Sequence, residues 1–213
     1  MNSIFRYKKT GIFLFALFYS LTAVLPSEAQ TAHFDDLKSK FAKGEIFSAD
    51  FRHQFNDAFT GEETVTEGKI WIGRDKYRIE ADNQVMVVNG ELSQVYDSTR
   101  NRLIISKYIE EEDDYAPSRM LQGVDESYTV HQQILNDDQV VITLITDDLF
   151  AIFNKVEIKL NSFGQPSMIE AVDQAENRLQ TVFIDGRFNK QMDDLFDLKA
   201  PDSAEVIDLR HES

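Results

Sequence analysis

The chain has 213 residues, which suggests one domain rather than two and is long enough to bury a substantial core. A hydrophobic content of 42% with 28% charged residues excludes global disorder. The net charge of −15 excludes nucleic acid and anionic lipid surfaces as partners held by charge, and the absence of cysteine excludes disulfides and a cysteine-linked lipid anchor.

The N-terminus has the layout of a secretory signal peptide. Three basic residues lie within positions 1–9, an apolar run spans 11–25, and small residues surround Ala29. The alternative is an uncleaved transmembrane anchor, but the apolar run is shorter than the ~20 residues needed to span a bilayer. We therefore expect a signal peptide over 1–29, cleavage after Ala29, and a single domain over 30–213.

The first element of the expected domain is a short amphipathic helix. In residues 34–43, Phe34, Leu37 and Phe41 have helical spacing, and Gly44 ends the run. From residue 47 to residue 55 every second side chain belongs to one largely apolar face, which predicts a strand.

Short strand-like segments follow almost to the C-terminus, separated by turn residues such as Asn89-Gly90. They are 65–73, 76–82, 84–89, 92–98, 102–109, 127–135, 139–146, 156–160, 167–173 and 178–185. About ten antiparallel strands in succession predict one large sheet that curls or closes.

Two segments interrupt this series. Residues 110–125 hold an acidic run and a helical-looking stretch from Ser118 to Gly123. Near the C-terminus, a helix-like stretch over 192–198 precedes an extended piece over 205–209.

The aromatic content raises the question of what fills a curved sheet. Sixteen phenylalanines are present in the whole chain, and twelve remain after the signal peptide. The concave face of such a sheet is filled either by its own side chains or by a ligand. An apolar ligand is one interpretation, and an ordinary aromatic core is the other.

The residue types needed for catalysis are sparse. The chain has no nucleophile elbow, no phosphate-binding loop and no metal-binding histidine spacing. His53 lies on the apolar face of its strand, where we expect a partly buried histidine with a polar partner rather than a ligand. The acidic run from Glu110 to Asp114 lacks the spacing of a calcium loop and is expected to be a solvated loop. The sequence thus predicts no enzyme, no catalytic residue, no metal and no cofactor.

Several motifs occur in a characteristic order. They are Phe47-Ser48-Ala49-Asp50-Phe51 with Gln54, the segment Gly68 to Arg74, Tyr77-Arg78-Ile79, Val87-Val88-Asn89-Gly90, Tyr96-Asp97, Pro117 to Gly123, the hairpin 156–173, and the ending from Leu195 to Asp208. This order resembles the outer-membrane lipoprotein carrier (LolA) family over nearly the whole mature chain.

The resemblance implies a fold and a function. The implied fold is mainly β, an incomplete, strongly curved antiparallel β-barrel with short lid helices, enclosing a hydrophobic cavity. The implied function is that of a soluble, monomeric periplasmic carrier. It would take acylated lipoproteins from an inner-membrane lipoprotein-releasing transporter and pass them to an outer-membrane acceptor where one exists.

The resemblance also assigns residues to roles. Arg74 matches the arginine that holds the empty form closed by bonding backbone of the lid helices, although Asp75 replaces the proline that usually follows it. The expected cavity wall consists of Phe51, Phe55, Trp71, Tyr77 and Ile79, and the expected lid underside of Leu37, Phe41, Met120 and Leu121. Ile70 and Ile72 lie on the face opposite to Trp71, so either set can be the inner one.

A second interpretation is a periplasmic sensor or regulatory module on the same scaffold, which binds a lipid or lipoprotein without transporting it. Such regulators usually carry a second domain. A third interpretation, the membrane-anchored acceptor, requires an anchoring cysteine that the chain lacks.

Overall fold

A computed structural model describes residues 31–113, 115–135, 139–190 and 194–211. The expected signal peptide over residues 1–29 lies outside these ranges. In the described part of the chain, no helix has the length and apolar character required to cross a membrane.

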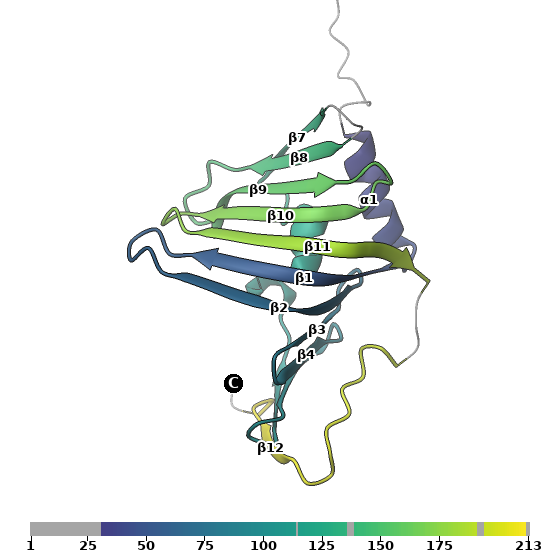
Figure 1. Ribbon diagram of the computed structural model, residues 1–213, viewed down its shortest axis with the longest axis vertical. Coiled ribbons are helices and arrows are strands. Elements are labelled where there is room, and N and C mark those ends of the chain that lie inside the picture. Colours follow the sequence, from purple (N-terminus) through teal and green to yellow (C-terminus); the bar gives the residue numbers. More distant parts are fainter. Residues whose placement is uncertain (1–30, 114, 136–138, 191–193, 212–213) are drawn as a thin grey trace, which may run out of the picture.

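The described residues form mainly strands with a few short helices (Figure 1). The helices are α1 (Ala32–Ala42), the 3-10 turn η2 (Glu110–Glu112) and α2 (Pro117–Gln122). The strands are β1 (Ile46–Asn56), β2 (Glu63–Ile72), β3 (Tyr77–Ala81), β4 (Gln84–Val88), β5 (Leu92–Asp97), β6 (Arg102–Lys107), β7 (Thr129–Ile134), β8 (Val140–Ile145), β9 (Phe153–Leu160), β10 (Pro166–Asp173), β11 (Arg178–Asn189) and β12 (Glu205–Asp208).

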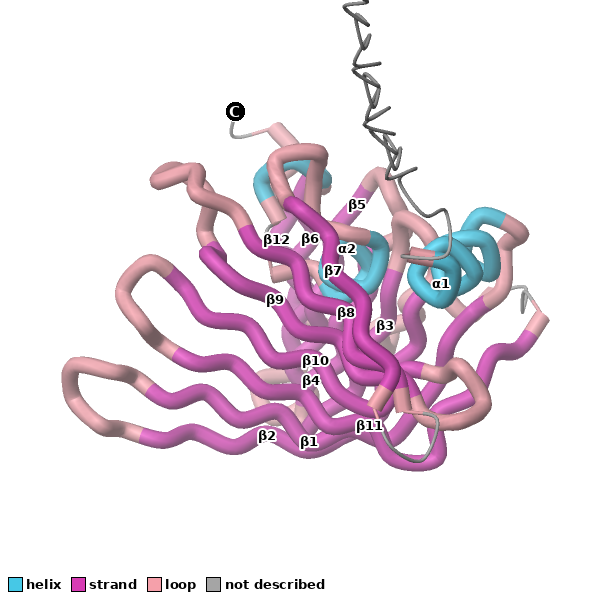
Figure 2. Tube along the Cα trace, turned by 90° about the horizontal axis from the view of Figure 1, so that it is seen from above, coloured by secondary structure: helices cyan, strands magenta, loops and turns pink. Residues whose placement is uncertain are grey.

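All of these strands belong to one sheet. Its order is β12-β6-β5-β4-β3-β2-β1-β11-β10-β9-β8-β7, with antiparallel neighbours except for the parallel pair β12–β6. The sheet curves without closing, and both α-helices lie on its concave side (Figure 2). The predicted fold class, a mainly β half-barrel with short helices, is confirmed.

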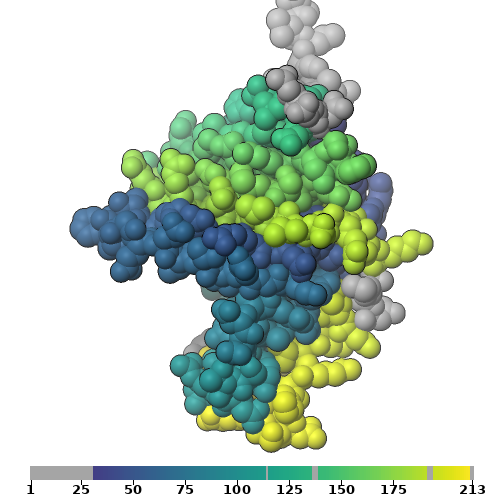
Figure 3. Space-filling model, viewed as in Figure 1, coloured from purple at the N-terminus to yellow at the C-terminus, as the bar shows by residue number. Residues whose placement is uncertain are grey.

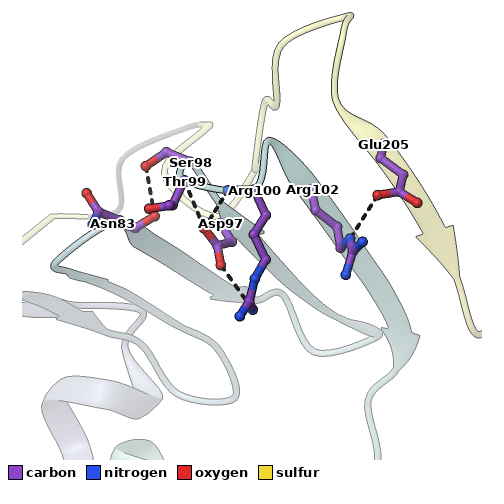
Figure 4. A network of polar contacts seen from close by, with 7 residues as sticks. All are labelled: Asn83, Asp97, Ser98, Thr99, Arg100, Arg102 and Glu205. Carbon is purple, nitrogen blue, oxygen red and sulfur yellow. Dashed lines mark hydrogen bonds and ion pairs between the residues drawn. The ribbon is translucent and has the colours of Figure 1, made fainter.

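Most of the expected elements occur where the sequence places them, and the C-terminal region differs. The predicted helix over 192–198 is absent from its described part, because residues 194–196 form a turn. The chain then continues to β12, which adds to the sheet as a parallel edge strand. Arg102 of β6 supports this pairing, since its Nε donates to Glu205 Oε2 at 2.9 Å, beside the Asp97 turn that joins β5 to β6 (Figure 4).

The concave face and the helices enclose the main hydrophobic core. Alternate residues of the strands point to one face of a sheet, so period-two apolar residues gather there. Phe34, Leu37 and Phe41 from one side of α1 pack against them. In β8 and β9 the completely buried members include Ile142, Leu144, Val156 and Ile158. Of the aromatic residues, Phe34, Phe41, Phe47 and Phe153 are almost completely buried in this core, whereas Phe59, Phe150 and Phe163 are exposed.

The convex face has its own, smaller apolar cluster. Phe196 from the segment after β11 packs there with Ile46 and Val87, and Trp71 joins them. Figure 3 shows the C-terminal residues in yellow lying along the lower strands. This segment covers the face that would otherwise expose Trp71 to water.

The curvature of the sheet depends on close backbone contacts. Gly68 lies in the middle of β2, where an added Cβ would be 2.0 Å from the carbonyl oxygen of Glu80 in β3. Only glycine permits this approach. A second irregularity lies between β1 and β11, where the register shifts after Ser48 and Asp185 has a φ of 53°. Bulges of this kind bend a strand and increase its twist.

Candidate functional site

An apolar cavity lies between the concave face of the sheet and the segment that carries α2. Its volume is about 290 Å³. The sheet contributes Phe51, His53, Thr66, Ile70, Ile79, Ile169, Ala171, Leu179, Thr181 and Phe183, and the α2 segment contributes Tyr115, Pro117 and Met120. Most of these side chains are apolar, which is the character of sites that bind hydrophobic ligands.

The position of the cavity follows from the strand register. Phe51 of β1 pairs with Gly68 of β2 on one side and with Phe183 of β11 on the other. The row therefore presents two aromatic side chains to the cavity, with backbone of β3 close against Gly68. On the other side of the cavity, Met120 reaches from α2 and is itself buried.

Polar contacts hold the segment of η2 and α2 to strand β3 and to the turn after β2, and a further one links η2 to α2. Tyr77 Oη of β3 donates to Asp113 Oδ2 at 2.7 Å. Arg119 Nη1 donates to the carbonyl oxygen of Glu110 at 3.1 Å, and Gln122 Nε2 donates to the carbonyl oxygen of Arg74 at 2.6 Å. We call these three hydrogen bonds the α2 contacts. Burial, followed by the bond to Asp113, raises the pKa of Tyr77 far above its ordinary value.

The residues expected on the underside of the lid are all buried in the main core. Leu37 and Phe41 come from α1, and Met120 and Leu121 come from α2. Helix α1 is also tied to the edge strand β7, because Gln132 Oε1 accepts from the backbone amide of Phe34 at 3.2 Å. Of the four residues, Met120 also lines the cavity.

The residues expected to line the cavity separate into three groups. Phe51 and Ile79 line it, and Phe55 packs beside it against the main core. Tyr77 is buried in a neighbouring cluster with Val88 and Ala116. Trp71 lies on the convex face, so its expected place in the cavity wall is corrected: Ile70, one position before it, occupies the inner face.

Arg74 occupies the exposed turn between β2 and β3, close to Glu110 and Gln122. Its backbone carbonyl, not its side chain, makes the contact with α2. Within the described residues the Arg74 guanidinium has no hydrogen bond, whereas Arg119 bonds backbone carbonyls. Neither Arg119 nor Gln122 is predicted from the sequence. The one sequence feature that could have identified them is their spacing, because Arg119 and Gln122 are polar residues three positions apart in a short helix.

The floor of the cavity contains one polar row. His53 pairs with Thr66 of β2 and with Thr181 of β11 in the sheet register, and all three side chains line the cavity. His53 Nδ1 lies 2.9 Å from Thr181 Oγ1. Burial lowers the pKa of the His53 imidazole below its ordinary value, which favours the neutral form. The prediction of a partly buried histidine with a polar partner is confirmed.

The described residues contain no group of three or more His, Cys, Asp or Glu side chains placed to hold a metal ion. The chemistry that the site supports is the shielding of apolar groups from water, with a small hydrogen-bonding capacity at the polar row.

Comparison with protein-family models finds no match, and no curated protein matches the sequence. Among solved structures, an uncharacterized conserved protein from Thermus thermophilus is similar at a TM-score of 0.54 and 10% identity, over 84% of this chain and 98% of that one. This likeness shows a shared fold.

Two further structures are similar at lower TM-scores. One is a putative outer membrane lipoprotein-sorting protein domain from Vibrio parahaemolyticus, with a TM-score of 0.44 and 13% identity over 80% of this chain and 97% of that one. The other is a LolA superfamily protein from Nitrosomonas europaea, with a TM-score of 0.41 and 11% identity over 79% and 98%.

Proposed function

We propose that this protein is a soluble periplasmic carrier that binds the acyl chains of lipoproteins in its apolar cavity and shuttles them from the inner to the outer membrane. The observation that carries the proposal is the cavity itself, walled by Phe51, Ile70 and Phe183 on the sheet and by Met120 on α2. Each CH₂ group kept from water contributes about 0.8 kcal/mol, so an acyl chain requires such shielding to cross an aqueous compartment.

The size of the cavity supports a binding cycle in which α2 moves. At about 290 Å³ it is just below the range of roughly 300–1,000 Å³ typical of small-molecule sites. A long acyl chain therefore requires displacement of the α2 segment. The α2 contacts oppose this displacement, so ligand binding and closure compete, which favours release once a better acceptor is available.

The remaining features of the chain are consistent with a mobile carrier. The basic, apolar and small-residue order of residues 1–29 predicts export, and the absence of cysteine leaves no residue for a cysteine-linked lipid anchor. The strongly negative charge disfavours adhesion to anionic membranes. The partners of the proposed cycle are an inner-membrane lipoprotein-releasing transporter, the acylated lipoproteins and, where present, an outer-membrane acceptor.

The proposal is tested with the mature protein and a triacylated lipopeptide. We expect the protein to bind the lipopeptide and to leave the same peptide without acyl chains unbound, as measured by fluorescence anisotropy of a labelled peptide. Equal binding of the two peptides would contradict a role for the cavity. Binding without transfer of the lipopeptide to acceptor vesicles carrying an outer-membrane acceptor would favour the sensor interpretation.

A cavity-filling variant separates binding from folding. Ala171 lines the cavity and is buried, so Ala171→Leu places three additional carbons in the empty space. We expect the affinity for the lipopeptide to fall at least tenfold with no loss of melting temperature, because the added side chain fills a void. Ala175→Leu, in the exposed turn after β10, is the matched control and leaves both quantities unchanged.

A further inference from the structure

The polar row at the floor of the cavity is unusual, because its three side chains come from three adjacent strands and face a cavity that is otherwise largely apolar. His53 and Thr181 satisfy each other through one hydrogen bond. Within the described residues, the hydroxyl of Thr66 has no hydrogen-bond partner. This hydroxyl is not among the fully buried polar atoms of the described residues, so it stays accessible and can donate to a ligand that enters the cavity.

The number of hydrogen-bond donors in the row can be counted. A neutral imidazole has one N–H and a threonine hydroxyl has one O–H, so the pair His53–Thr181 has two donated hydrogens in either tautomer. One of them forms the bond of 2.9 Å between Nδ1 and Oγ1. When Thr181 donates to Nδ1, the other is the N–H at Nε2, and with the hydroxyl of Thr66 on the adjacent strand it leaves the row two neighbouring donors for a ligand.

Two donors match the acceptor capacity of one carbonyl oxygen, which has two lone pairs. A carboxylate matches less well, because it has about four acceptor sites and a charge. Among the described residues that line the cavity the one basic side chain is His53, and its burial favours the neutral imidazole, so a carboxylate there would be buried without a fixed positive charge. Burial of an unpaired charge is far more costly than burial of a neutral polar group.

We propose that the hydroxyl of Thr66 and the Nε2 side of His53, whose Nδ1 is held by Thr181, bind the carbonyl oxygen of a fatty acyl ester or amide, so that the cavity selects esterified or amidated acyl chains over free fatty acids and plain hydrocarbons. This inference rests on the proposed binding of acyl chains in the same cavity. It adds a polar recognition element to a site that the proposed function treats as apolar. The carbonyl can belong to an acylated protein or to a free glycerolipid.

The test compares ligands that differ at the carbonyl. Methyl decanoate, an n-alkane of equal length and decanoate compete with a fluorescent apolar dye for the mature protein. The double variant carries Thr66→Val and Thr181→Val, which keep the side-chain shape. The control Thr143→Val alters a threonine on the face of β8 opposite to the buried Ile142 and Leu144. We expect the double variant to lower the ester-to-alkane affinity ratio about tenfold, and the control to leave it unchanged.

The possible outcomes separate this inference from the proposed function. If ester and alkane displace the dye with the same affinity ratio in the wild-type protein and the double variant, the polar row is structural and the inference fails while the proposed function stands. If neither ligand binds, both fail. Tighter binding of decanoate than of its methyl ester would also overturn the inference, because the row would then recognise a carboxylate.

A second comparison identifies the source of the carbonyl. A triacylated lipopeptide and a monoacylglycerol are titrated into the wild-type protein and the double variant. If the double variant binds either ligand about tenfold more weakly than the wild-type protein does, the row recognises the carbonyl. The ligand whose binding is weakened identifies the source of the carbonyl. If neither loses affinity although both bind, the inference is contradicted.

Discussion

Protonation of the His53 imidazole makes the stability of the folded protein depend on pH. Burial lowers its pKa below the ordinary value of 6.5, so the unfolded chain binds the proton more readily than the folded protein does. As the pH falls through about 6.5, the unfolded state is therefore favoured, and the folded state loses stability until the imidazole itself is protonated. Above this range the contribution of His53 to stability is constant.

We expect the melting temperature of the wild-type protein to fall more steeply between about pH 7.5 and pH 5.5 than that of His53→Gln. The other histidines are present in both proteins, so their contributions cancel in the difference. Parallel curves for the two proteins would show that the fold does not favour the neutral imidazole.

A second prediction at the scale of one residue concerns the hydroxyl of Tyr77. Tyr77→Phe removes the 2.7 Å hydrogen bond to Asp113 and leaves the carboxylate of a half-buried residue with one donor fewer. A hydrogen bond to a charged group contributes about 1.5–3 kcal/mol. We expect the amides of α2 to exchange with solvent at least about tenfold faster. Tyr96→Phe is the control, because the hydroxyl of Tyr96 donates to Asn101, away from α2. An equal change in both variants would indicate a general loss of stability instead.

The role of Arg74 remains a prediction. Its guanidinium lies close to Glu110 and Gln122 without a hydrogen bond to a lid carbonyl in the described part of the chain, while Arg119 makes such bonds from the helix itself. Sequence motifs could place Arg74 at the end of β2. They could not predict which of two arginines reaches the carbonyls, because that depends on how η2 and α2 pack against the turn.

At the scale of the elements, the bend of the sheet at β2 depends on Gly68. A Cβ at this position would overlap the carbonyl oxygen of Glu80, and backbone cannot yield as a side chain can. We expect Gly68→Ala to lower the free energy of unfolding by about 3 kcal/mol, measured by urea denaturation.

Gly61→Ala is the matched control, since Gly61 has a φ of 70° and nothing within 4 Å of an added Cβ. There the cost comes from backbone conformation alone and is about 1–2 kcal/mol. If the two variants lose the same stability, the approach of β3 to β2 is not what restricts position 68 to glycine.

Strand periodicity predicted most of the elements, and it could not decide which face of β2 is concave. Trp71 lies on one face and Ile70 on the other, and both sets are apolar. The choice is made by residues far along the chain: Phe196 covers Trp71 from the convex side, and α2 covers Ile70 from the concave side. Local sequence contains no information on either contact. The parallel pairing of β12 depends in the same way on a long connection.

At the scale of the whole molecule, ligand binding must stabilise the fold. A ligand that binds only the folded protein raises the free energy of unfolding by about 2.7 kcal/mol at a concentration of 100 Kd. For a domain of this size, that corresponds to a rise in melting temperature of about 5–10 °C. We expect the triacylated lipopeptide to produce this rise in the wild-type protein and a smaller one in Ala171→Leu. A rise of equal size in both proteins would indicate binding outside the cavity.

The order of the strands also determines when the sheet can form. The central strand β1 pairs with β11, so Phe51 reaches its partner Phe183 only after almost the whole chain is available. Contacts between residues distant in sequence make folding slow. A nascent chain that lacks β11 leaves one side of β1 unpaired and its core incomplete. The strands that are synthesised last therefore complete the domain, and the first half of the sheet has no finished core until they arrive.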